Sequence, residues 1–133
     1  MDFLKQYEIY YQKAITDIVA SEILFASDNS QIDHHVICFH LQQAIEKLLK
    51  SYLSHQDIHY PKTHDTSFLF DKIKLFDSNC YEDFNDLSDL DIYAVEARYD
   101  FIVNEHIDVC TYIKKVQDFS NYIKSRINFN TSI

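Results

Sequence analysis

The 133-residue chain contains no glycine and a single proline, Pro61. Glycine normally takes the left-handed backbone conformations of tight turns and allows a backbone to approach a phosphate closely. The chain therefore contains neither a Walker loop nor a Rossmann fingerprint, since both are glycine motifs. Glycine and proline are also the two residues that most disfavour a helix interior. Their near absence predicts a helical protein.

Apolar residues recur every three to four positions in five segments, which is the spacing of one helix face. The segments cover approximately residues 2–27, 31–55, 64–77, 82–99 and 106–127. Asn29 is expected to end the first helix in a left-handed conformation, and Thr63 or Asp65 to cap the third. No segment alternates as a strand does, and the links are short. We predict one domain over residues 1–133, an all-α up-and-down four-helix bundle with a short additional helix.

The cysteines indicate a reducing compartment. Cys38, Cys80 and Cys110 are odd in number, and no two have a C-x-x-C spacing. We interpret all three as free thiols that serve as small buried apolar residues. No apolar run approaches the roughly 18 residues of a transmembrane helix, and the N-terminus lacks a signal-peptide pattern. The chain is therefore expected to be cytoplasmic, without a membrane segment.

Charge and histidine spacing narrow the function classes. The formal net charge of −9 opposes a large nucleic-acid-binding face but leaves room for a small cationic pocket. None of the seven histidines belongs to a Glu-x-x-His pair of the kind that builds metal sites in helical bundles. No serine or cysteine stands beside a histidine in a nucleophile motif. We expect neither a bound metal nor another cofactor.

Two clusters remain as candidates for chemistry. One is "CFHLQQAIEKLLKSYL" at 38–53, which carries Lys47 and a Glu46/Lys50 pair and is followed by "YPKTHD". The other is "YAVEARYD" at 93–100. An arginine in this apolar context requires a carboxylate or phosphate partner, so Arg98 faces either a ligand or an internal acid such as Glu46. Lys47 and Lys50 are alternatively solvated, with their stems over apolar surface.

These blocks resemble the HEPN domain (higher eukaryotes and prokaryotes nucleotide-binding). The shared features are an A-x-E-K-x-L-K helix, a P-K-T-H-D turn and an A-R-Y step, in this order. The resemblance implies a bundle of four to five helices that usually dimerises. It also implies action beside a small nucleotidyltransferase, in toxin–antitoxin-like or mobile-element operons. Another group of HEPN proteins are metal-independent endoribonucleases, in which an arginine is followed four to six residues later by a histidine.

The sequence departs from that ribonuclease motif. Seven residues separate Arg98 from His106, and Asp100 adds a negative charge that opposes a phosphodiester. We therefore favour a nucleotide-binding or interaction module over an enzyme, with Arg98, Tyr99 and Lys47 as the candidate nucleotide-binding residues. The alternative is an endoribonuclease toxin that acts on RNA, with Arg98 and His106 as its catalytic residues. Surplus apolar residues on the first, second and fourth helices further predict a symmetric homodimer.

Overall fold

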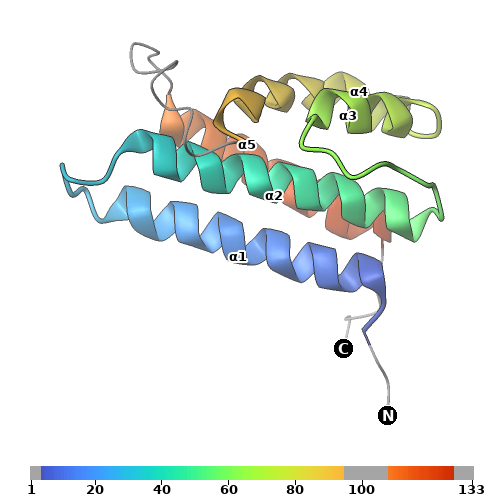
Figure 1. Ribbon diagram of the computed structural model, residues 1–133, viewed down its shortest axis with the longest axis horizontal. Helices are drawn as coiled ribbons and strands as arrows, with labels where there is room; N and C mark the ends of the chain where they lie inside the picture. The colour runs from blue at the N-terminus through green and yellow to red at the C-terminus, as the bar shows by residue number, and fades with distance from the viewer. Residues whose placement is uncertain (1–3, 95–107, 128–133) are drawn as a thin grey trace.

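The computed structural model describes residues 4–94 and 108–127, and these form helices without any strand. The elements are α1 (Gln6–Ala26), α2 (His34–His55), α3 (Thr66–Lys74), α4 (Ser78–Phe84), the 3-10 helix η1 (Asn85–Tyr93) and α5 (Val109–Ile127). Figure 1 shows α1 and α2 antiparallel, with α5 alongside them and α4 and η1 returning over α2. The predicted all-α bundle with a short additional helix, α3, is confirmed. No helix in the described part of the chain is long and apolar enough to cross a membrane.

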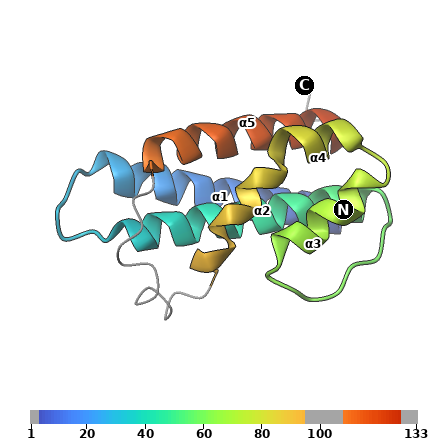
Figure 2. The same ribbon diagram turned by 90° about the horizontal axis from the view of Figure 1, so that it is seen from above.

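The central element is α2, which packs against α1, α3, η1 and α5. Figure 2 shows it enclosed between these neighbours. Fourteen of its 22 residues are buried, so the helix is covered on more than one face. Its predicted apolar stripe is buried throughout: Ile37, Leu41, Ala44, Ile45, Leu48, Leu49 and Tyr52. Each large side chain in this stripe contributes about 1.5–3 kcal/mol through burial. The core is therefore organised around α2.

Aspartate occupies the left-handed position that glycine usually takes after the end of a helix, in both of the first two helices. Asp28 follows α1 with φ 48° and Asp57 follows α2 with φ 56°, both in the left-handed region. Aspartate tolerates this region better than most residues. After α2 the backbone N–H of Ile58 donates to the Leu53 carbonyl over 3.0 Å, which closes the last turn. The sequence prediction of Asn29 was therefore wrong by one residue. Asp65 caps α3 as predicted, because its side chain accepts from the Phe68 N–H.

The region predicted as one fourth helix, 82–99, is divided. Residues 78–81, predicted to link the third and fourth helices, instead form the first part of α4, and the chain then continues as η1 up to Tyr93. The buried residues of η1 are Leu87, Leu90 and Tyr93. Their spacing of three matches the three residues per turn of a 3-10 helix. The remainder of the predicted helix, 95–99, lies outside the described residues.

Some apolar stripes are narrower than predicted. Cys110 is exposed, whereas Cys38 and Cys80 are buried as expected. The buried positions of α5 begin at Val109 and continue at Ile113, so Cys110 lies beside the stripe rather than in it. Further residues assigned to inner faces are also substantially exposed: Leu4, Phe68 and Phe76.

A buried carboxylate joins three helices at one end of the bundle. Asp77 Oδ2 accepts from the Tyr52 hydroxyl over 2.6 Å and from the Tyr122 hydroxyl over 2.7 Å. Asp77 Oδ1 accepts from the Cys80 N–H and so caps α4, while Arg126 Nε lies 3.4 Å from Oδ2. Burial opposes ionisation of Asp77, but these hydrogen bonds and the Arg126 charge outweigh it and lower the pKa of the carboxyl. Asp77 thus ties α2, α4 and α5 together.

Candidate functional site

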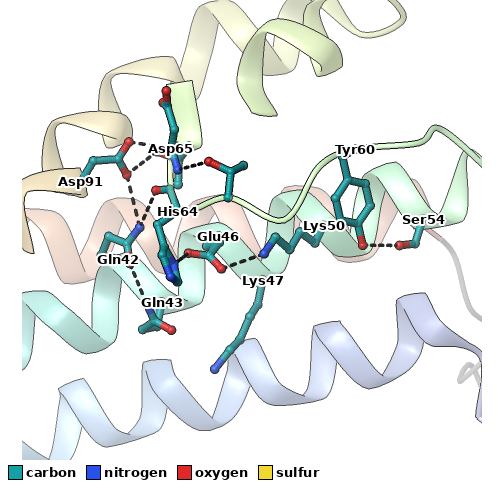
Figure 3. Close-up of polar contacts among 12 residues, drawn as sticks. Gln42, Gln43, Glu46, Lys47, Lys50, Ser54, Tyr60, His64, Asp65 and Asp91 are labelled. Atoms are coloured by element: carbon teal, nitrogen blue, oxygen red, sulfur yellow. Dashed lines mark hydrogen bonds and ion pairs between the residues drawn. The ribbon is translucent and has the colours of Figure 1, made fainter. Parts of the chain in front are cut away.

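The connector between α2 and α3, residues 56–65, runs back along α2. Figure 3 shows Tyr60 beside Ser54 and His64 beside Glu46. The Tyr60 and Ser54 hydroxyls are hydrogen-bonded over 3.0 Å, and His64 Nδ1 lies 2.7 Å from Glu46 Oε1. The P-K-T-H-D turn and the A-x-E-K-x-L-K helix, separate in the sequence, therefore meet on one surface.

The Glu46–Lys50 pair lies beneath this connector. Lys50 Nζ donates to Glu46 Oε2 over 2.9 Å, and the two side chains are 10% and 8% exposed. The pairing on one helix face confirms the sequence interpretation, but the alternative of a solvated Lys50 is wrong. The two Glu46 oxygens bind Lys50 and His64, so Glu46 already has internal partners of its own.

A second carboxylate fastens the start of α3 to η1. Asp91 accepts from the Thr66 N–H over 2.8 Å and from the Thr66 hydroxyl over 2.7 Å. Gln42 on α2 donates to Asp91 and to the His64 carbonyl, over 3.3 Å in each case. Burial raises the pKa of Asp91, because the bonds from Thr66 and Gln42 only partly offset the desolvation and the Asp65 charge adds to it. The connector is thus held to α2 at both of its ends.

Lys47 lies on a different face of α2 from Lys50. Its side chain points away from the connector toward α1 (Figure 3). Lys47 Nζ lies 2.6 Å from Asp17 Oδ2, and His40 Nδ1 lies 2.9 Å from Asp17 Oδ1. The Lys47 charge is therefore matched by Asp17 on α1 rather than directed at an open site.

The other residues predicted for the site, Arg98, Tyr99 and His106, lie outside the described residues. The structure therefore places only Lys47 of the predicted set. Among residues 4–94 and 108–127, no three or more histidine, cysteine, aspartate or glutamate side chains are grouped so that they could hold a metal ion.

A groove of about 930 Å³ lies where the start of α1, the end of α2 and the connector meet. Its cations are Lys5, Lys50 and Lys62, and its aromatic side chains are Tyr7, Tyr10 and Tyr60. One carboxylate, Asp57, and two histidines also line it. Lys50 is paired with Glu46, so Lys5 and Lys62 against Asp57 leave a positive lining on a chain whose net charge is −9. Such a lining favours an anionic ligand.

Tyr60 contributes a hydroxyl that stays protonated. Burial raises the pKa of Tyr60 to about 12, with a further rise from neighbouring Tyr10 and a partial lowering from the Ser54 hydrogen bond. In the sequence, Lys50 belongs to a candidate cluster and Lys62 to the P-K-T-H-D turn, but neither was predicted as a ligand residue. The groove was missed because it is completed by the start of α1, and this part of the sequence carries no motif.

The fold and groove define a helical-bundle domain with a cationic, tyrosine-lined recess at one end. The sequence matches the model of the HEPN domain family over residues 7–126, so the chain belongs to the HEPN family. The crystal structure of ST0689, an archaeal HEPN homologue, superimposes with a TM-score of 0.68 at 20% identity. That match covers 94% of this chain and 100% of the other, and it shows a shared fold. No curated protein sequence matches the chain.

Proposed function

We propose that this HEPN protein is a dimeric cytoplasmic module that binds a nucleotide or another small phosphate-bearing ligand and works with a small nucleotidyltransferase in a toxin–antitoxin-like system. The observation that carries the ligand class is the groove, which gathers three lysines on a strongly acidic chain. The net charge of −9 opposes the binding of a long polyanion more than that of a short ligand. The nucleotidyltransferase partner rests on the resemblance of the sequence blocks to HEPN proteins.

Arg98 and Tyr99 remain candidate ligand residues in this proposal. Lys47 is a weaker candidate, because Asp17 matches its charge. The competing function is a metal-independent ribonuclease that uses Arg98 and His106 on RNA. The residues between them exceed the four to six of the ribonuclease motif.

Labelled single-stranded RNA separates these two functions. We expect RNA incubated with the protein in EDTA to remain intact, while nucleotide binding is measurable by calorimetry. Arg98→Ala and His106→Ala are the matched variants. Cleavage by the wild type that both variants lose would establish the ribonuclease and contradict the binding module.

The outward face of α1 supports the predicted homodimer. Ile9, Val19 and Ile23 are 40%, 43% and 64% exposed, and Thr16 lies on the same face at helical spacing. A symmetric contact through this face would bury the exposed apolar side chains on both copies.

We expect the wild type to sediment as a dimer at about 50 μM and Val19→Glu/Ile23→Glu to sediment as a monomer, since each added carboxylate would have to be buried at the interface. Leu75→Glu is the control, because Leu75 lies on α3–α4 surface away from α1 and is 85% exposed. A monomeric wild type would contradict the dimer. If Leu75→Glu dissociates the dimer, the interface lies at the α3–α4 surface rather than on α1.

A further inference from the structure

We propose that the groove is a nucleoside polyphosphate site in which Lys50, Lys62 and Lys5 hold the phosphates and the tyrosine wall holds the base. The inference rests on the proposed function and deepens it, because it moves the ligand away from Lys47, whose side chain pairs with Asp17, to the groove beside the end of α2. Its lining comes entirely from described residues of α1, α2 and the connector.

Lys50 is the anchor of the proposed site. The residue is 8% exposed, and yet it lines the groove. An ammonium group has three donors, and within residues 4–94 and 108–127 the hydrogen-bond partner of Lys50 Nζ is Glu46 alone. Glu46 is also shared with His64. A buried charge is costly unless its donors are satisfied, so a phosphate oxygen in the groove would supply what Glu46 does not.

The remaining charges fit several phosphates rather than one. Lys5 and Lys62 are exposed and approach the groove from α1 and from the connector. Among the described residues, the only carboxylate in the groove lining is Asp57. Three ammonium groups on three separate segments match a chain of phosphates better than a single phosphate ion.

Groove size and aromatic content point to a nucleoside. A volume of about 930 Å³ is large for an inorganic phosphate and falls within the range of small-molecule sites. Tyr7, Tyr10 and Tyr60 offer π-faces on which a base can stack. Tyr7 is already held edge-on against His55, with ring centroids 4.8 Å apart. The net charge of −9 opposes a long RNA more than a short ligand, which favours a mononucleotide.

Calorimetry without magnesium tests the site, with ATP, tripolyphosphate, adenosine and a single-stranded RNA decamer as probes. We expect ATP to bind the wild type more tightly than the other three. Lys50→Met should weaken ATP binding by about tenfold or more. Since this variant leaves Glu46 without its lysine, the exposed Lys62→Met serves as a second variant that cannot disturb the core. Lys114→Met, at an exposed pair on α5, is the matched control and should bind ATP normally.

Tyr10→Leu tests whether the base of the nucleotide stacks on the tyrosine side chains. It should reduce the affinity for ATP by about fivefold or more and leave that for tripolyphosphate unchanged, because stacking is lost and the phosphate contacts remain. Unchanged ATP binding in the three groove variants, with loss in Arg98→Ala, would overturn the groove assignment while the proposed function stands. Failure of the wild type to bind ATP, GTP, CTP or UTP would overturn the nucleoside polyphosphate site, and failure to bind tripolyphosphate as well would overturn the proposed function. Tighter binding of the RNA decamer than of ATP would replace the nucleotide with RNA.

Discussion

Replacing Asp77 with alanine is expected to lower the free energy of unfolding by about 3 kcal/mol or more. The substitution removes the N-cap of α4 and two hydrogen bonds from buried or half-buried tyrosine hydroxyls to a carboxylate. Hydrogen bonds to a charged group are worth more than neutral ones, and both tyrosine hydroxyls would lose their carboxylate acceptor. Urea unfolding followed by circular dichroism at pH 7 measures the loss.

The pH dependence gives this prediction a second readout. The folded protein lowers the pKa of Asp77, so the ionised carboxyl stabilises the fold above the unfolded pKa of about 3.9. That contribution is lost as the pH falls through the still lower folded value. The difference between wild type and Asp77→Ala should therefore shrink between pH 5 and pH 3. Asp118→Ala, at an exposed pair with Lys114, should change stability by about 0.5 kcal/mol or less. A loss below 1 kcal/mol for Asp77→Ala at pH 7 would contradict the role assigned to Asp77.

Glu46→Leu is expected to cost about 3 kcal/mol of unfolding free energy, because it leaves the Lys50 ammonium buried without its carboxylate. The double variant Glu46→Leu/Lys50→Met should recover most of that loss, since paired apolar residues replace a buried ion pair at little cost. A double-mutant cycle from urea unfolding at pH 7 gives the coupling energy directly.

The exposed pair Lys114–Asp118 provides a matched cycle, because it has the same i,i+4 spacing on a solvated face. Its coupling is expected to be about 0.3–0.5 kcal/mol, against about 2 kcal/mol for Glu46–Lys50. Equal couplings for the two pairs would show that water reaches Lys50 through the groove as freely as it reaches Lys114.

Periodicity was enough to predict α2 but not η1. Every apolar position assigned to the α2 stripe is buried, because side chains at helical spacing leave only one arrangement in which they all avoid water. In η1 the buried Leu87, Leu90 and Tyr93 recur every three residues, and a helix of either kind accommodates such a short run. The fold class was therefore predictable, whereas the division of the fourth segment depended on tertiary packing.

The site was less predictable than the fold for a related reason. Lys47 and Lys50 lie in the same helical motif, and the sequence does not indicate which neighbouring segment will cover each lysine. Asp17 of the preceding helix pairs with Lys47, and the returning connector buries Lys50. Cations from separate segments converge only after the chain has folded, so the groove follows from tertiary structure rather than from any one motif.

The fastening of the connector has a consequence for the strength of binding. Ten residues without regular structure would ordinarily lose conformational entropy when a ligand orders them. Here Ser54, Glu46 and Gln42 already hold Tyr60 and His64 in place on α2. Most of that ordering has thus occurred during folding. A ligand that enters the groove therefore loses less binding free energy to ordering the connector.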